Sequence, residues 1–477
     1  MTGIHFNWVG GCEIPAVDVA PNINPSDLAD CVGEFARADA GQAHEAIAAA
    51  RAAFPGWSRS TPQQRADLLD RAGTLIHERR AQLGELLARE EGKPLNEATG
   101  EVIRAAQIFK FFAGEPLRPG GELMPSVRPG VDVEISHEPV GVIGLITPWN
   151  FPIAIPAWKI APALAFGNCC ILKPADLTPG CAHALVAILQ EAGAPAGVVN
   201  LVMGRGSVVG DALVESPDVD AISFTGSVQT GRAIAARCMQ TGKRVQCEMG
   251  GKNPLVVLDD ADLDTAVSVA LNGAFFSTGQ RCTASSRLIV TEGVHDAFVD
   301  RLRREMLTLR VGHALDPDTQ IGPVVDERQL QQDLDYIAIG HAEGAEVIGG
   351  SRLDAPTAGF FLQPALLVGT APGMRVNREE IFGPIASVIR AADDDEALAI
   401  ANDVEFGLSA GVCTTSLARA RRFKRDLEAG MVMVNLPTAG VDYHVPFGGR
   451  KGSSIGPREQ GGYARQFYSI VKTSYVG

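Results

Sequence analysis

The chain has 477 residues, too many for one hydrophobic core, and its 46% hydrophobic and 21% charged residues are typical of a globular enzyme with two or three domains. A formal net charge of −14, without any run of lysine and arginine, argues against a nucleic-acid partner, because a phosphate backbone requires a basic surface. The sequence begins without a secretory signal, and its nine cysteines follow neither a disulfide framework nor the CxxC spacing of a zinc site. We therefore expect a cytoplasmic protein with no bound metal, in which a special cysteine would be a reactive one.

Helices are expected first along the chain, because residues 35–115 are rich in alanine and carry charged residues on alternate faces. Residues 117–135 are rich in proline and glycine and alternate in polarity, which predicts an exposed hairpin. From residue 140, apolar segments alternate with helical ones, and the expected strands are VGVIGLIT, NCCILKPA, GVVNLVMG, DAISFTG and RVQCEM. This alternation predicts a parallel sheet with helices on both faces, the usual location of a dinucleotide.

One stretch in this region, residues 141–172, carries a single charged side chain, Lys159, and is long enough to cross a bilayer. A lipid-facing helix would leave backbone groups unsatisfied where prolines interrupt it. These prolines are Pro148, Pro152, Pro156 and Pro162. We therefore expect a buried strand, a turn and a core helix, and no association with a membrane.

A second set of strands and helices, from about residue 254 to 464, predicts a second α/β domain. Its strands are expected at PLVVLDDAD, SSRLIVTEG, EVIGG, FLQPALLVG, IASVIRAADD and GMVMVNL. The tail, YSIVKTSYVG, is β-prone and has no partner strand nearby in the sequence. With the hairpin, it is expected to add to the sheet of a neighbouring subunit, which predicts a homodimer or homotetramer.

Three turns offer groups to a dinucleotide. FTGSVQTGR follows an apolar strand and opens a helix, so Ser227 and the neighbouring N–H groups can meet a pyrophosphate. GRGSVVG, which contains Gly206 and Gly210, has GxGxxxG spacing and is either a second phosphate loop or only a tight turn. In LKPADLTPG, Lys173 and Asp176 are three residues apart and can contact the hydroxyls of an adenosine ribose.

The candidate nucleophile is Cys282 in FFSTGQRCTASSR, where small polar neighbours predict a tight loop. A single free cysteine is more often a buried apolar side chain, so this residue alone carries little weight. Two other groups support it. Glu248 precedes two glycines in EMGGKNP, where a sharp turn can expose its carboxylate, and Asn150 in TPWNFP can donate its amide to an oxyanion.

Six motifs occur in order along the chain: TPWNFP, FTGS, EMGGKNP, GQRC, EEIFGPI and PFGGRKGS. Together they resemble the signatures of the aldehyde dehydrogenase superfamily. The resemblance implies a Rossmann-like NAD(P)-binding domain (residues 1–116 and 138–249), an α/β catalytic domain (250–462) and a small β arm for oligomerisation (117–137 and 463–477). The last motif departs from the family pattern, because Ser454 stands where glycine is common, and no catalytic role is expected there.

The resemblance also implies a role for each matching residue. Cys282 is the nucleophile, Glu248 is the general base, Asn150 and the N–H of Cys282 form the oxyanion hole, and Lys159 matches a lysine linked to proton relay. The residues expected around the dinucleotide are Ile146, Thr147, Trp149, Lys173, Asp176, Gly206, Gly210, Phe224, Ser227, Gly250, Glu380 (on the nicotinamide ribose) and Phe382 (beside the nicotinamide).

The expected reaction is the oxidation of an aldehyde to a carboxylate with NAD(P), through a thiohemiacetal and a thioester on Cys282. Glu248 would activate the water that hydrolyses the thioester, and relatives that acylate coenzyme A generally lack this base, so hydrolysis is expected. A carboxylate at Asp176 accepts a hydrogen bond from a ribose 2′-OH and repels a 2′-phosphate, which predicts that NAD is preferred to NADP.

For the substrate, GQRCTASSR and KPADLTP are most similar to the α-ketoglutaric semialdehyde (2,5-dioxopentanoate) branch. Arg281, beside the nucleophile, either donates two hydrogen bonds to a substrate carboxylate, or points outward to solvent or pairs locally. Succinic semialdehyde members carry arginines at the positions of Trp158 and Phe276, and the absence of both arginines here weakens an assignment to the succinic semialdehyde branch. A broad aliphatic or aromatic aldehyde in an apolar tunnel of Phe151, Trp158 and Phe447 is the alternative. A catalytically silent homologue and a nucleotide-binding module without a reaction are the alternatives from other classes.

Overall fold

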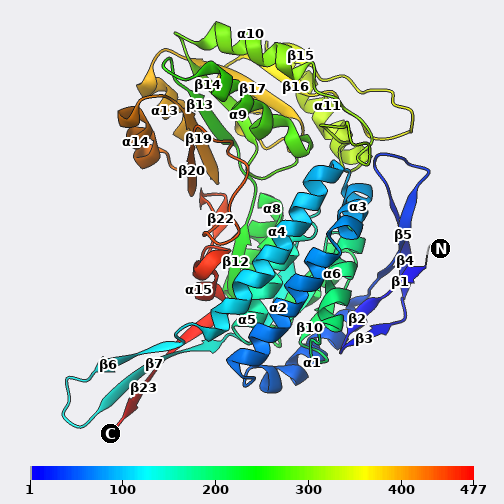
Figure 1. Cartoon of the computed structure of the whole chain (residues 1–477), viewed down its shortest axis with the longest axis vertical. Helices are drawn as coiled ribbons and strands as arrows, with labels where there is room; N and C mark the ends of the chain where they lie inside the picture. Colours follow the sequence, from blue (N-terminus) through cyan, green and yellow to red (C-terminus); the bar gives the residue numbers. More distant parts are fainter. Residues whose placement is uncertain (1–2) are drawn as a thin grey trace.

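The computed structural model describes residues 3–477, and two mainly parallel sheets organise it (Figure 1). The first sheet has the order β22-β12-β11-β8-β9-β10-β2-β3. Its central strands are parallel, as predicted: β8 (Val142–Ile146), β9 (Cys169–Lys173), β10 (Val199–Leu201), β11 (Ala221–Thr225) and β12 (Arg244–Glu248). Residues 1–2, where the expected cofactor domain begins, lie outside the described residues.

Short antiparallel strands complete both edges of this sheet. They are β2 (Asn7–Val9) and β3 (Cys12–Ile14) at one edge and β22 (Ser454–Ile455) at the other. Strand β22 comes from the segment after PFGGRK and pairs with β12, with Ser454 opposite Glu248. A loop distant in sequence therefore lies beside the end of the strand that carries the candidate base.

Helices form layers on this sheet because each crossover between parallel strands carries one. The helices are α1 (Ala40–Trp57), α2 (Pro62–Glu78), α3 (Arg80–Glu91), α4 (Leu95–Gly114), α5 (Ala154–Ala165), α6 (Pro179–Glu191), α7 (Asp211–Glu215) and α8 (Val228–Gln240). Helix α7 contacts both α1 and α8, whereas α5 and α6 are backed by α2, α3 and α4. The predicted helical region is correct except at its start, where residues 35–37 end β5 (Cys31–Arg37), which pairs with β1 (Ile4–His5) and β4 (Asp18–Ile23).

The second sheet has the order β15-β16-β17-β14-β13-β19-β20 and is parallel apart from β15. Its strands are β13 (Asn253–Val257), β14 (Ser285–Thr291), β15 (Glu346–Gly349), β16 (Ala365–Thr370), β17 (Ile385–Ala391), β19 (Ser409–Cys413) and β20 (Met431–Val434). Its helices are α9 (Leu263–Phe275), α10 (His295–Met306), α11 (Glu327–Ala342), α12 (Arg375–Arg378), α13 (Asp394–Asn402) and α14 (Leu417–Asp426). The sequence did not predict β19, since Ala410 and Gly411 at its centre lack the β-branched character of a typical strand.

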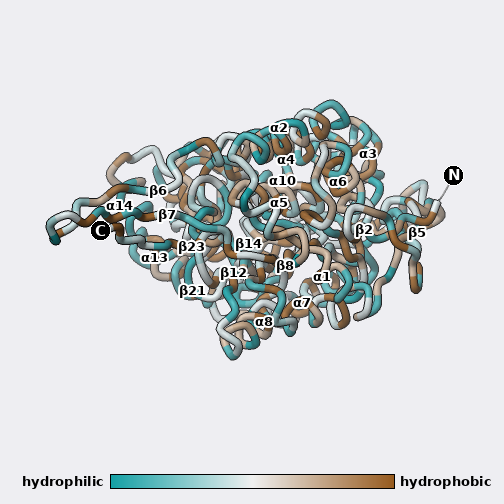
Figure 2. The backbone as a smooth tube through the Cα atoms, turned by 90° about the horizontal axis from the view of Figure 1, so that it is seen from below, coloured by the Kyte–Doolittle hydropathy of each residue, from teal (hydrophilic) through white to brown (hydrophobic). Residues whose placement is uncertain are grey.

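A narrow arm projects from the body, and its apolar segments are visible in Figure 2. The predicted hairpin forms β6 (Gly121–Pro125) and β7 (Asp132–Pro139). The tail after α15 (Arg465–Tyr468) forms β23 (Ser469–Val476), which pairs along its whole length with β7. The expectation that the tail adds to a neighbour's sheet needs this correction: within one chain the tail already completes the sheet of its own hairpin.

No helix within residues 3–477 combines the length and the apolar composition that a membrane crossing requires. The apolar stretch that begins at residue 141 forms β8, a turn and the buried helix α5, as predicted.

Candidate active site

Cys282 lies in the loop between the short helix η3 (Phe276–Gly279) and β14, at the wall of a cavity of about 340 Å³. This loop turns tightly, because Ser277 and Thr278 have φ values of 50° and 56°. At Gly279 (φ 65°) a Cβ atom would lie 2.1 Å from the backbone oxygen of Gly383. Cys282 remains half-buried, with access to the cavity. The tight loop predicted from the small neighbours is confirmed.

Asn253, at the start of β13, holds this loop from behind. Its Nδ2 donates to the backbone oxygens of Cys282 (2.8 Å) and Ala284 (2.9 Å), and its Oδ1 accepts from the N–H of Ser409 at 3.0 Å. The loop is therefore tied to both β13 and β19. The sequence did not lead us to predict a role for Asn253, although this residue belongs to the EMGGKNP motif.

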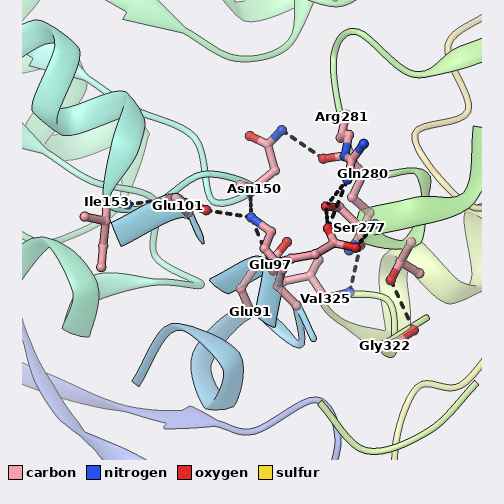
Figure 3. Close-up of polar contacts among 12 residues, drawn as sticks. Glu91, Glu97, Glu101, Asn150, Ile153, Ser277, Gln280, Arg281, Gly322 and Val325 are labelled. Atoms are coloured by element: carbon pink, nitrogen blue, oxygen red, sulfur yellow. Dashed lines mark hydrogen bonds and ion pairs between the residues drawn. The ribbon is translucent and has the colours of Figure 1, made fainter. Parts of the chain in front are cut away.

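Asn150 is buried, and its side chain points to the same loop (Figure 3). Its Nδ2 donates to the backbone oxygen of Gln280 at 2.9 Å, and the Gln280 side chain in turn accepts from the N–H of Val325 at 2.9 Å. A carboxamide nitrogen carries two hydrogens, so this bond orients the amide and leaves a second N–H. That geometry suits a donor held ready for an oxyanion.

A buried ion pair fixes the turn that carries Asn150 (Figure 3). Lys93, between α3 and α4, donates from Nζ to Glu101 Oε2 and to the backbone oxygen of Asn150, both at 2.7 Å. The other oxygen of Glu101 accepts from the N–H groups of Ile153 (3.0 Å) and Ala154 (3.1 Å) at the start of α5. A carboxylate is favourable there because the first N–H groups of a helix lack partners inside it. Neither Lys93 nor Glu101 was predicted.

Glu248 is buried at the end of β12. Ser454 Oγ donates to Glu248 Oε2 at 2.5 Å and accepts from the N–H of Gly449 at 2.6 Å. Glu248 Oε1 has no partner within residues 3–477. Ser454, for which no role was expected, therefore contacts the candidate base, and that expectation is corrected.

Lys159 is fully buried in α5 and forms an ion pair with Glu459. It also donates to Ser223 Oγ at 2.7 Å. Burial, followed by the nearby charge of Glu459, raises the pKa of Glu248 well above its ordinary value. The direct partner of Lys159 is Glu459, and Lys159 influences Glu248 only through the electrostatic effect of its charge.

The cysteine thiol is also held in its protonated form. Burial, and then the negative charges of Glu380 and Glu248, raise the pKa of Cys282 to about 12. The thiolate is the nucleophilic form of cysteine, so catalysis requires a positive charge that reaches this loop with substrate and cofactor bound.

The cavity beside Cys282 brings together all the predicted substrate residues. Phe151, Trp158 and Phe447 line it, with the rings of Trp158 and Phe447 stacked at 5.4 Å between centroids. The fourth, Arg281, also lines it. Its Nη2 donates to Glu97 Oε2 and to Ser277 Oγ, both at 2.9 Å, so its charge already has a carboxylate partner (Figure 3). It is therefore not simply a solvent-facing side chain, and whether it contacts substrate stays a prediction.

The residues predicted around the dinucleotide gather at the carboxyl ends of the parallel strands of the first sheet, the edge at which open α/β sheets bind ligands. Ile146 ends β8 and Thr147 directly follows it, Lys173 ends β9, and Phe224 lies in β11. Ser227 caps α8, where its Oγ accepts from the N–H of Thr230 at 3.3 Å. Gly206 and Gly210 bound one helical turn after β10. The strand–turn–helix context predicted for FTGS is thus confirmed.

Two buried hydroxyls at this edge, Thr147 Oγ1 and Thr225 Oγ1, have no partner among the described residues, which fits a polar ligand. Nearby, Lys173 Nζ lies 3.3 Å from Asp176 Oδ1, on a side chain that is 35% exposed. This pair leaves the Asp176 carboxylate partly open to a ribose.

The remaining predicted cofactor residues lie in loops: Trp149 after β8, Gly250 between β12 and β13, and Glu380 and Phe382 between α12 and β17. Glu380 accepts from the N–H of Gly251 at 2.9 Å, and burial raises its pKa to about 7. A Cβ atom at Gly250 would lie 2.0 Å from a Glu380 oxygen, so glycine is required for this approach. Phe382 and Trp149 pack edge to face, with 5.5 Å between ring centroids. Groups from the two sheets therefore meet between the dinucleotide edge and Cys282.

Comparisons with known proteins agree with this arrangement. The model of the aldehyde dehydrogenase family matches residues 15–474. The α-ketoglutaric semialdehyde dehydrogenase of Bacillus subtilis is 41% identical over 99% of this chain and 98% of its own length. The 2,5-dioxopentanoate dehydrogenase of Saccharolobus solfataricus is 40% identical over 100% and 99% of the two chains. A crystal structure of betaine aldehyde dehydrogenase from Staphylococcus aureus in complex with NAD+ superposes with a TM-score of 0.96 at 33% identity, covering 99% of this chain and 95% of the other.

Proposed function

Because this chain belongs to the aldehyde dehydrogenase family and oxidises an aldehyde to a carboxylate with a nicotinamide cofactor, we propose that Cys282, Glu248 and Asn150 perform the reaction on a carboxylated semialdehyde such as 2,5-dioxopentanoate. The site assignment rests on how separate parts of the chain come together at the Cys282 loop. Segments far apart in sequence place an oriented amide, a cysteine and an apolar cavity together at one loop.

In the first step, the Cys282 sulfur attacks the aldehyde carbon, and the carbonyl oxygen takes the negative charge. The free N–H of Asn150 and the backbone N–H of Cys282 receive this oxyanion. When bound, a nicotinamide cofactor would supply a positive charge that favours loss of the Cys282 proton, and it would accept the hydride from the carbon on sulfur, which leaves a thioester on Cys282. Asn253 and Gly279 keep the loop in place while the carbon on sulfur changes geometry.

In the second step, Glu248 takes a proton from water, and the water oxygen attacks the thioester carbon. The carbon–sulfur bond then breaks, which releases the carboxylate and returns the Cys282 sulfur to its free form. The unpartnered Oε1 of Glu248 is the oxygen available for the proton from water. Ser454 donates a hydrogen bond to the other oxygen of Glu248, and the buried Lys159–Glu459 ion pair fixes the charges around this carboxylate.

The proposed substrate class rests on the named relatives and on the cationic groups in the cavity. We expect wild-type kcat/KM to be higher for 2,5-dioxopentanoate and succinic semialdehyde than for hexanal and benzaldehyde, and higher with NAD than with NADP. Initial rates of NAD(P)H formation over this panel test both points. If hexanal or benzaldehyde gave the highest value, the proposal of a carboxylated substrate would fail. Equal use of NADP would remove the role given to Asp176.

The oxyanion role of Asn150 predicts that Asn150→Ala lowers kcat by about 10²- to 10³-fold with a small change in KM, because the donor acts mainly on the developing charge. Steady-state kinetics with one semialdehyde measure this effect. Asn272→Ala is the matched control, since Asn272 lines the same cavity and its side chain forms no hydrogen bond to the Cys282 loop within residues 3–477. Equal losses in the two variants would show that Asn150 has only a packing role.

The proposal extends to a cytoplasmic homodimer or homotetramer assembled through the arm. Both edges of the arm sheet, β6 and β23, lack a further strand within the described chain. Exposed apolar side chains are frequent along it, as expected for a surface that is covered in an assembly. They are Leu117, Leu123, Met124, Val127, Ile470, Val471, Tyr475 and Val476.

A further inference from the structure

Three cationic side chains line the cavity beside Cys282: Lys93, Arg104 and Arg281. Two of them already have carboxylate partners, Glu101 for Lys93 and Glu97 for Arg281. An ion-paired cation has little charge left to attract an anionic substrate.

Arg104, in the middle of α4, is different. Within residues 3–477 it forms no ion pair, and its hydrogen bond is one from Nη2 to the side-chain oxygen of Gln460 at 3.3 Å. Its Nε is enclosed and has no partner. Its guanidinium carbon lies 5.9 Å from the centre of the Trp158 ring. Burial lowers the pKa of Arg104, as expected for a charge placed in apolar surroundings.

An uncompensated buried charge is costly, and proteins normally pair it. The neighbours of Arg104 in the cavity include the apolar side chains of Ile155, Trp158 and Phe447. The charges of Glu101 and Asp442 oppose the effect of burial on the pKa of Arg104, but neither forms an ion pair with it within residues 3–477, and Glu101 is paired with Lys93. A guanidinium offers five N–H donors in a planar fork that matches a carboxylate, and Gln460 uses one of them. The partner missing from this site is therefore an anion that enters through the cavity.

We propose that Arg104 binds the carboxylate of the substrate and sets the preference for semialdehydes that carry an acid group at the far end from the aldehyde. This inference rests on the proposed function and names the residue that selects its substrate class. Trp158 packs against the guanidinium and Gln460 orients it, while the aldehyde carbon lies at Cys282. Arg281, the arginine suggested by the sequence, instead ties the Cys282 loop to α4 through Glu97.

The test compares Arg104→Met, Arg104→Lys and Arg281→Met with the wild type, using succinic semialdehyde and butanal, which have equal chain lengths. For Arg104→Met we expect kcat/KM for succinic semialdehyde to fall by about 10- to 100-fold, mainly through KM, as expected for loss of a charge-assisted hydrogen bond. The value for butanal should change less than about threefold, because no charge is recognised there. Arg104→Lys should lie between the two, since an ammonium keeps the charge without the fork. Arg281→Met should leave the ratio between the two substrates unchanged.

Inhibition by succinate gives a readout that does not depend on turnover of the acid substrate. With butanal as substrate, the inhibition constant of succinate should rise about 10- to 100-fold in Arg104→Met and stay constant in Arg281→Met. Equal losses with both aldehydes, or a change of the ratio in Arg281→Met alone, would overturn the role of Arg104. A wild type that prefers butanal would instead overturn the proposed substrate class. A wild type that prefers the acid and keeps this preference in Arg104→Met would overturn the inference alone.

Discussion

Replacement of Cys282 by serine is expected to lower kcat by about 10⁴- to 10⁶-fold with every aldehyde, because the variant lacks the nucleophile on which both steps depend. A serine hydroxyl loses its proton far less readily than a thiol, and the surroundings of this site already disfavour the anion of the cysteine. The loop itself should remain intact, since Asn253 and Asn150 bind it through backbone oxygens. NADH formation measured over hours with concentrated enzyme quantifies the remaining rate.

The control for this variant is Cys12→Ser, because Cys12 is an exposed cysteine in the short strand β3. The Cys12→Ser variant should retain full activity, which would show that removal of a thiol does not by itself lower kcat. A Cys282→Ser protein that kept more than about a hundredth of the wild-type kcat would contradict the assignment of the nucleophile, since losses of a nucleophile are far larger.

Replacement of Glu248 by glutamine is expected to separate the two steps. The amide has nearly the same shape and keeps an oxygen for Ser454, but it cannot accept a proton from water. The first turnover should therefore release NADH in a burst equivalent to the active sites, followed by hydrolysis slowed by about 10²- to 10⁴-fold. Stopped-flow absorbance with enzyme and substrate at comparable concentrations resolves the two phases.

Dependence on pH provides an independent readout of the same residue. A raised pKa means that the active carboxylate form of Glu248 becomes populated only at a higher pH than for an ordinary glutamate, so the hydrolysis rate of the wild type should increase with pH through that shifted range. The slow phase of Glu248→Gln should lose this dependence. Glu405→Gln, a change at a side chain that is 77% exposed, should behave like the wild type in both experiments. A slow rise of NADH without a burst would mean that Glu248 acts before hydride transfer.

The chemistry-bearing residues could be predicted where the signal is local. Ser227 follows an apolar strand and opens a helix, so its place at the dinucleotide edge could be read from a few consecutive residues. Cys282 and Glu248 stand next to small residues and glycines, which indicate tight turns. The alternation of strands and helices predicted both sheets, because buried parallel strands are continuous apolar runs.

Contacts between distant segments could not be predicted in this way. The pairing of β23 with β7 joins the end of the chain to the hairpin, and neither pattern indicates its partner. Lys93 and Arg104 lie in a region that the sequence marks only as helical and charged. Lys93 forms an ion pair with Glu101, whereas Arg104 forms none within residues 3–477, and the helical pattern does not distinguish the two. Arg281 drew attention because it adjoins Cys282, whereas the structure pairs it with Glu97.

We propose that Cys282 carries the acyl group and that this group leaves by hydrolysis through Glu248. The most direct measurement is peptide mass analysis of Glu248→Gln quenched with acid immediately after the NADH burst with succinic semialdehyde. We predict that the peptide containing Cys282 gains the mass of one succinyl group in proportion to the NADH released, and that the other eight cysteines stay unmodified. A full burst with an unmodified Cys282, or an acyl group on another cysteine, would contradict the claim.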